Sequence, residues 1–92
     1  MTRVRVEFTV EPFVDASPGA HVRAAWQAVE AHGCELIQGP FSAETSVEVA
    51  DAHVILGDVL RAALANGATH LSFLVDLVEE DGAPAGPLEI DA

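Results

Sequence analysis

The sequence has little cysteine and no long apolar run. Cys34 is the single cysteine among 92 residues, so no disulfide can form within the chain, and a reduced, intracellular protein is the simpler interpretation. No apolar run approaches the roughly 18–20 residues of a membrane span, and no signal-peptide pattern precedes the first predicted strand. We therefore expect a cytoplasmic protein without a membrane-inserted segment.

Basic residues are also scarce. Four arginines and no lysine face fifteen acidic residues, which gives a formal net charge of −11. Such a surface repels phosphate backbones and anionic lipids, so we expect neither nucleic acid nor a membrane surface as a partner. It suits a cationic or hydrogen-bond-donating ligand, although solubility and salt adaptation explain the same charge.

The motifs of common catalytic and metal sites are missing. The chain has no glycine-rich phosphate loop, no Gly-x-Ser-x-Gly and no ordered triad. None of His21, His32, His53 and His70 stands at metal-ligand spacing from another ligand. Cys34 follows a predicted helix end, where the negative end of the helix dipole disfavours a thiolate. We expect no catalytic residues, no metal and no bound cofactor.

Half of the residues are hydrophobic, which is enough for one domain with its own core. We assign residues 1–78 to this domain and residues 79–92 to an acidic tail that contains prolines and glycines. The tail is expected to be mobile, although Leu88 and Ile90 alternate in a way that suits docking on a sheet edge. A domain this short is marginally stable alone, so we expect a homodimer or homotetramer.

Four segments have strand patterns. The clearest is VRVEFTVEPF, residues 4–13, in which apolar and polar residues alternate until Pro12, which cannot donate to a sheet ladder. The others are residues 34–38, 41–47 and 69–78. The side chains expected to point inward are Val4, Val6, Phe8, Val10, Phe41, Ala43, Thr45, Val47, Leu71, Phe73, Val75 and Leu77.

Two segments have helical periodicity. The first is expected to begin with Ser17 as cap and Pro18 in the first turn, to bury Trp26 in the core, and to end at Gly33. The second covers residues 49–66, with an apolar stripe formed by Ala52, Ile55, Leu56, Val59, Leu60, Ala63 and Leu64. Gly57 inside it indicates close packing or a bend.

The predicted element order is β-α-β-β-α-β, which is typical of the α+β ferredoxin-like fold. Right-handed crossovers place both helices on one face of a four-stranded antiparallel sheet, with the first and third strands central. The opposite face would carry polar side chains that can accept hydrogen bonds from a nitrogenous ring and attract a cation. These candidate ligand-binding residues are Glu7, Thr9, Glu44, Ser46, His70 and Ser72. A solvated or dimer-buried face explains the same pattern.

Several stretches are similar to a known family: FTVEPF (Phe8–Phe13), Ala31-His32-Gly33, a hairpin near Gly39-Pro40, and GATHLSFLVDL (Gly67–Leu77). Together they resemble the thiamine-binding, YkoF-like family of ferredoxin-like domains, over residues 4–78. The resemblance implies non-catalytic binding of thiamine or its hydroxymethylpyrimidine moiety, in vitamin B1 salvage or transport. It also implies assembly through strand-to-strand or sheet-to-sheet contacts.

The third strand departs from the related pattern, which reads Met-Gly-Thr followed by an acidic residue and glycine. Here the stretch is Phe41-Ser42-Ala43, with Ser46-Val47 following, and we hypothesise that Glu44 replaces the missing acid. Two alternatives stay open. One is a dimeric α+β barrel enzyme of the monooxygenase or isomerase kind, with His70, His53 or Trp26 near its pocket. The other is an ACT-like regulatory module that binds an amino acid.

Overall fold

The computed structural model describes residues 1–12 and 18–89, and the elements within these ranges follow the predicted order. They are the strands β1 (Arg3–Glu11), β2 (Ile37–Gln38), β3 (Ala43–Glu48) and β4 (His70–Val78), the helices α1 (Ala20–Ala31) and α2 (Ala52–Ala65), and the 3₁₀ turn η1 (Val49–Asp51). None of the helices in the described part of the chain is long and apolar enough to cross a membrane.

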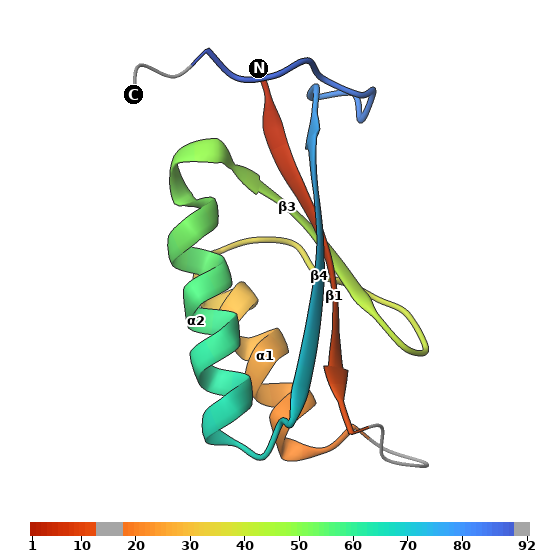
Figure 1. Cartoon of the computed structure of the whole chain (residues 1–92), viewed down its shortest axis with the longest axis vertical. Coiled ribbons are helices and arrows are strands. Elements are labelled where there is room, and N and C mark those ends of the chain that lie inside the picture. Colours follow the sequence, from red (N-terminus) through yellow and green to blue (C-terminus); the bar gives the residue numbers. More distant parts are fainter. Residues whose placement is uncertain (13–17, 90–92) are drawn as a thin grey trace.

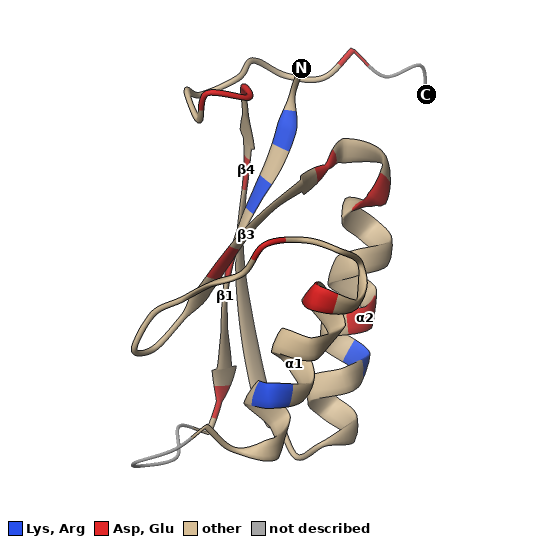
Figure 2. Cartoon of the chain, turned by 180° about the vertical axis from the view of Figure 1, so that it is seen from behind, with Lys and Arg blue, Asp and Glu red and all other residues tan. Residues whose placement is uncertain are grey.

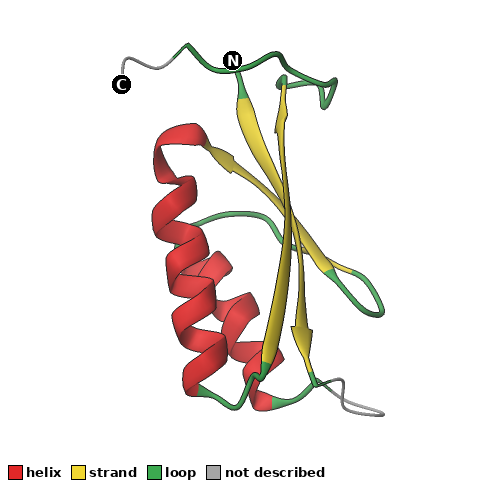
Figure 3. Ribbon diagram, viewed as in Figure 1, coloured by secondary structure: helices red, strands yellow, loops and turns green. Residues whose placement is uncertain are grey.

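The four strands form one antiparallel sheet in the order β2-β3-β1-β4. Both helices pack on the same face of this sheet, and the other face is open (Figure 1; Figure 3). The predicted ferredoxin-like α+β fold is therefore confirmed, including the central position of β1 and β3.

The core lies between the helices and the inner face of β1. Val4, Val6, Phe8 and Val10 are each no more than 5% exposed, as their strict alternation predicts. The helices contribute Ala25, Val29, Ile55, Val59 and Ala63, and Trp26 packs against this core from a partly buried position. The Phe8 and Phe73 rings meet with centroids 6.1 Å apart, which joins β1 to β4.

The glycines that follow the helix C-termini have the expected backbone conformation, whereas the first helix begins later than predicted. Gly33 and Gly67 have φ of 76° and 107°, the conformation that glycine adopts most readily after a helix. The first helix begins at Ala20 with Gly19 as its N-cap residue, so Pro18 precedes the helix rather than opening it. Ser17, the predicted cap, lies outside the described residues.

Several side chains predicted to lie in the core are exposed. Phe41 is 69% exposed, because the turn in which Gly39 N–H donates to the Ser42 carbonyl (2.7 Å) delays the start of β3 until Ala43. Val75 pairs with Val6 on the helix-covered face, as predicted, but it is 54% exposed because β4 is the outer strand. Leu60 and Leu64 on α2 are also exposed.

Two further details of the predicted elements differ. The second strand is reduced to Ile37–Gln38, since only these residues pair with β3. Apart from its chain neighbours and the backbone of its own helix, nothing lies within 4 Å of a Cβ built on Gly57, so of the two predicted reasons for this glycine, close packing is excluded.

The segment after β4 begins with a hydrogen-bonded turn. Glu79 N–H donates to the Ala83 carbonyl (2.7 Å) and Ala85 N–H donates to the Leu77 carbonyl (3.1 Å), around a β-bridge between Val78 and Pro84. The edge contact therefore involves Pro84 rather than Leu88, which is half-buried, and Ile90 lies outside the described residues.

Candidate functional site

The six predicted ligand-binding residues all belong to the open face of the sheet. Glu7 and Thr9 come from β1, Glu44 and Ser46 from β3, and His70 and Ser72 from β4. The register pairs Glu7 with Glu44 and Thr9 with Ser72, so these side chains emerge on the same side as neighbours.

The same register shows that the six residues do not converge on one point. Ser46 stands opposite Arg5, whereas His70 stands opposite Glu11, six positions further along β1. At about 3.4 Å per residue this separation is about 20 Å, too far for one small ligand to contact both ends. The predicted set therefore divides into two ends and a centre.

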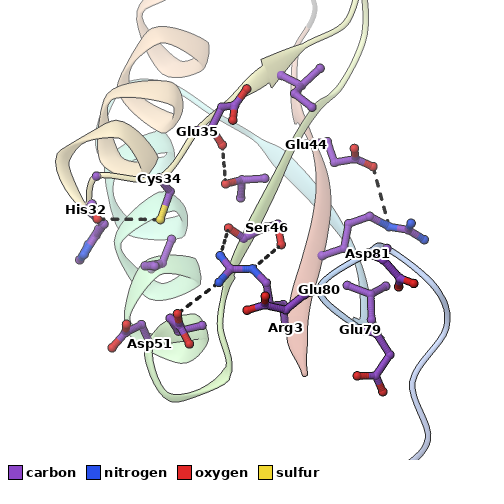
Figure 4. A pocket seen from close by; sticks show the side chains of 18 of the residues that line it. Arg3, His32, Cys34, Glu35, Glu44, Ser46, Asp51, Glu79, Glu80 and Asp81 are labelled. Carbon is purple, nitrogen blue, oxygen red and sulfur yellow. Dashed lines mark hydrogen bonds and ion pairs between the residues drawn. The ribbon is translucent and has the colours of Figure 1, made fainter. Parts of the chain in front are cut away.

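At one end Ser46 accepts hydrogen bonds from Arg3, which precedes the predicted first strand. Arg3 donates from Nε to Ser46 Oγ (3.0 Å) and from Nη2 to the Ser46 carbonyl (2.9 Å), and it pairs with Glu48 at 3.2 Å (Figure 4). Ser46 therefore helps to orient Arg3, and it is less available to a ligand than predicted.

At the other end the polar groups contact one another. His70 Nε2 lies 3.0 Å from Ser72 Oγ and 3.6 Å from Glu11 Oε2, and all three residues are accessible to solvent. These three residues form a local polar cluster outside the pocket described below.

In the centre two carboxylates lie beside apolar side chains. Glu7 accepts a hydrogen bond from Ser42 Oγ (3.1 Å), and Glu44 lies 3.9 Å from Arg5 Nε. Leu74 stands opposite Glu7 and Ile37 opposite Glu44, and these two apolar side chains are 65% and 59% exposed. The centre therefore presents negative charge next to an apolar surface.

A pocket of about 660 Å³ begins beside this centre and extends around the edge of β3. Its walls come from four parts of the chain: the α1–β2 loop, β3, the start of α2, and the turn after β4, together with Arg3 and Arg5 of β1 (Figure 4). Of the six predicted residues, Glu44 and Ser46 line it.

The pocket exists because β2 is so short. Ile37 and Gln38 pair with Glu44 and Ala43, and the chain before Ile37 leaves the sheet instead of pairing with the rest of β3. The buried Thr45 Oγ1 donates to the Glu35 carbonyl (2.7 Å) and fixes the loop in this position. The loop thus forms a wall where a longer strand would have filled the space.

The lining of the pocket is strongly acidic. It contains two arginines and seven carboxylates, those of Glu35, Glu44, Glu48, Asp51, Glu79, Glu80 and Asp81. Figure 2 shows the basic segments of β1 near the N-terminus and acidic segments on the surrounding elements. Ile37, Val54 and Ile55 add apolar surface. A cation with a flat apolar part suits this combination of groups.

The histidine and cysteine of the pocket have other partners. His32 Nε2 lies 2.7 Å from Asp58 Oδ2, which joins the end of α1 to α2, and Cys34 Sγ lies 3.9 Å from the His32 carbonyl. Among the residues that the structure describes, no three His, Cys, Asp or Glu side chains are grouped so that they could hold a metal ion.

Sequence reasoning missed most of this pocket because its walls are distant in the sequence. The loop at residues 32–37, the start of α2 and the turn at residues 79–82 carry no shared motif. The one available signal was the run Glu79-Glu80-Asp81 before Gly82, which we had assigned to a mobile tail. Arg5 alternates outward in the predicted first strand, whereas Arg3 precedes that strand, and the ion pairs of both depend on the register.

Comparison with solved structures finds the same fold elsewhere. A domain of unknown function, DUF77, from Bacillus cereus matches with a TM-score of 0.61 at 15% identity, and the match covers 91% of this chain and 82% of the Bacillus chain. A protein from Thermotoga maritima, named a putative thiamine biosynthesis/salvage protein, matches with a TM-score of 0.57 at 16% identity, and the match covers 90% of this chain and 89% of the Thermotoga chain. Protein SP2199 from Streptococcus pneumoniae matches with a TM-score of 0.51 at 20% identity, and the match covers 82% of this chain and 83% of the Streptococcus chain.

No protein-family model and no curated protein matches the sequence. At identities of 15–20% the structural likeness establishes the fold. The fold implied by the resemblance to the YkoF-like family is thus shared with these proteins.

Proposed function

We propose that this protein binds thiamine, or a closely related aminopyrimidine cation, in the pocket at the edge of β3 and does not transform it. The main observation that supports this proposal is the pocket of about 660 Å³, whose lining contains seven carboxylates and only two arginines. Its volume falls within the ~300–1,000 Å³ of small-molecule sites. A structural neighbour named a putative thiamine biosynthesis/salvage protein adds support for this ligand class.

The chemistry of the ligand matches both parts of the lining. The positively charged thiazolium ring is attracted by carboxylates, and the pyrimidine amino group donates hydrogen bonds to carboxylate or carbonyl oxygens. The aliphatic side chains of Ile37, Val54 and Ile55 offer apolar surface for the faces of the rings. This mixture of an apolar surface and a few polar groups is typical of small-molecule sites.

Glu44 is the residue on which we place the cation contact. It belongs both to the central group on the open face and to the pocket lining, and Arg5 Nε lies 3.9 Å from it, a long separation for an ion pair. Its charge is therefore only partly compensated by the protein. It is also the residue that we hypothesise to replace the acid of the related sequence pattern.

Calorimetric titration with thiamine tests the proposal, with Glu44→Gln as the variant and Glu11→Gln as its matched control. Both changes remove one carboxylate from the same sheet face, but Glu11 does not line the pocket. We expect Glu44→Gln to weaken binding about fivefold, since a half-exposed charge contact is worth about 1 kcal/mol. Glu11→Gln should leave the affinity unchanged.

Hydroxymethylpyrimidine serves as a second ligand because it lacks the thiazolium charge. If the carboxylates attract the cation, its affinity should be lower than that of thiamine and should respond less to salt. Absence of heat and of any melting shift at millimolar thiamine would contradict the proposal.

The two alternatives find less support in the geometry. The enzyme of the α+β barrel kind would need His70, His53 or Trp26 at its pocket, and none of these lines the pocket at the edge of β3. His70 and His53 are exposed, and Trp26 packs against the core. An amino acid, the ligand of an ACT-like module, would bring its own carboxylate into an acidic lining, which is unfavourable.

A further inference from the structure

The basic side chains among the described residues that line the pocket all have an acidic partner. The chain contains four arginines and no lysine, and two of the arginines, Arg3 and Arg5, line the pocket. His32, which is positively charged when protonated, also lines it, and its Nε2 lies 2.7 Å from Asp58 Oδ2. A ligand with a negatively charged group would therefore compete with the protein's own carboxylates for every cation of the lining.

Arg3 uses all three of its guanidinium nitrogen atoms within the protein. Nε donates to Ser46 Oγ (3.0 Å), Nη2 donates to the Ser46 carbonyl (2.9 Å), and Nη1 lies 3.2 Å from Glu48 Oε1 (Figure 4). Arginine recognises a phosphate best through two parallel N–H groups. Because Ser46 takes one pair of donors and Glu48 takes the third nitrogen, a phosphate at Arg3 would have to displace the Glu48 carboxylate or lie beside it.

Arg5 lies between two carboxylates that come from the strands on either side of it. Its Nη2 is 3.3 Å from Asp76 Oδ2 on β4, and its Nε is 3.9 Å from Glu44 Oε1 on β3. A phosphate placed next to Arg5 would therefore meet two negative charges for one positive charge. Neither arginine offers a guanidinium without a carboxylate beside it.

The start of α2 is the other feature of the lining that could attract an anion, since the N–H groups of a first helical turn carry positive partial charge. Here the N-cap residue of α2 is Asp51, which itself lines the pocket. The N–H of the next residue, Ala52, donates to the Val49 carbonyl of η1. The helix start thus presents a carboxylate where an anion would bind.

Acidic side chains also lie on each wall of the pocket. The α1–β2 loop, β3, the start of α2 and the turn after β4 each contribute at least one, in the order Glu35, Glu44 and Glu48, Asp51, and Glu79, Glu80 and Asp81. A phosphate group that enters the pocket therefore meets net negative charge in any orientation of the ligand.

We infer that the pocket binds the unphosphorylated form of its ligand in preference to the phosphate esters, an inference that rests on the proposed function. Glu48 and Asp51 determine this selectivity, because they hold negative charge at Arg3 and at the start of α2, where a phosphate would otherwise bind. Thiamine carries one positive charge, and a phosphate monoester adds about −1.5 to −2 near pH 7, which makes the net charge of the ester negative.

Calorimetric titration with thiamine and with thiamine monophosphate tests the selectivity. The buffer contains no divalent cation, because Mg²⁺ can bridge a phosphate to carboxylates. We expect the monophosphate to bind at least about tenfold more weakly at low salt, and the difference to shrink in ~1 M salt. Equal or tighter binding of the monophosphate would overturn the inference and leave the proposed function standing. Absence of thiamine binding would contradict the proposed function, and this inference with it.

Glu48→Gln tests the assignment to a residue, with Glu11→Gln as its matched control. Glutamine at position 48 keeps an acceptor for Arg3 but removes the charge beside it, whereas Glu11 pairs with His70 at 3.6 Å outside the pocket. We expect Glu48→Gln to tighten monophosphate binding about threefold and to leave thiamine binding equal or weaker. Glu11→Gln should change neither affinity. An unchanged ratio of the two affinities in Glu48→Gln, or the same change in both variants, would contradict the role of Glu48.

Inorganic phosphate gives a readout that needs no thiamine. It is titrated to millimolar concentration against an equal ionic strength of chloride, and the backbone amide shifts of the wild type are followed by nuclear magnetic resonance. We expect the amides of Ser46, Asp51 and Ala52 to keep their shifts. A saturable change at these positions would reveal an anion site in the pocket and overturn the inference, whatever the result with thiamine.

Discussion

Glu7 of β1 and Glu44 of β3 are direct cross-strand neighbours, so two carboxylates stand opposite each other on the open face. Like charges in this position destabilise a sheet. Ser42 donates to Glu7 at 3.1 Å, and Arg5 lies 3.9 Å from Glu44, so the repulsion is only partly relieved. Glu44 also lines the pocket, so this repulsion lies next to the candidate site.

Replacing Glu7 by glutamine should stabilise the protein. Glutamine keeps the oxygen that accepts from Ser42 but removes the repulsion with Glu44. We expect a gain of about 0.2–1 kcal/mol in the free energy of unfolding at low salt, measured by urea denaturation. In 1 M salt the gain should nearly vanish because the charges are screened. A loss of stability at low salt would show that the carboxylate charge of Glu7 is itself stabilising.

Replacing Arg5 by glutamine should strengthen cation binding. Arg5 lines the pocket and pairs with Asp76 at 3.3 Å, so its removal leaves the lining more negative. We expect thiamine affinity to rise about threefold at low salt, opposite in sign to Glu44→Gln, since exposed ion pairs are worth about 0–1 kcal/mol. Arg61→Gln, on a residue that does not line the pocket, is the control for the change in net charge.

Replacing Thr45 by valine should loosen the wall of the pocket. The variant keeps the buried shape but removes the hydrogen bond from Thr45 Oγ1 to the Glu35 carbonyl. We expect a loss of about 1 kcal/mol in the free energy of unfolding, with faster hydrogen exchange in residues 34–37. Thr45→Ser keeps the hydroxyl and should retain slow exchange there, so equally fast exchange in both variants would count against this role.

Two glycine-to-alanine changes should have opposite effects. A Cβ at either Gly33 or Gly57 meets no atom within 4 Å, so neither change causes a clash. Gly33 has φ of 76°, where alanine is strained, and we expect Gly33→Ala to cost about 1 kcal/mol. Gly57 lies inside α2, and alanine there should add about 1 kcal/mol in thermal or chemical unfolding. Effects of the same sign would contradict these helix assignments.

The sequence predicts the fold well where one constraint dominates. β1 alternates without exception because it is central and covered on one face, and Gly33 and Gly67 mark helix ends through their backbone conformation. The prediction fails where contacts with neighbouring segments determine the position of a side chain. Phe41 was placed inward by its spacing from Ala43, but the turn closed by Gly39 and Ser42 holds it outside the strand.

The candidate site was predicted only in part for the same reason. Alternation correctly placed Glu44 and Ser46 on the open face, but it says nothing of position along the sheet or of competition from Arg3. The pocket depends on the shortness of β2 and on a turn beyond β4, and both are set by contacts between distant segments. Neither leaves a periodic signal.

Nuclear magnetic resonance mapping of a thiamine titration tests the central claim most directly. We predict that the backbone amide shifts change in residues 32–37, 44–48 and 79–82, which surround the pocket, and stay constant at Thr9, His70 and Ser72. Shifts confined to the latter three residues, or no shifts at millimolar thiamine, would contradict it.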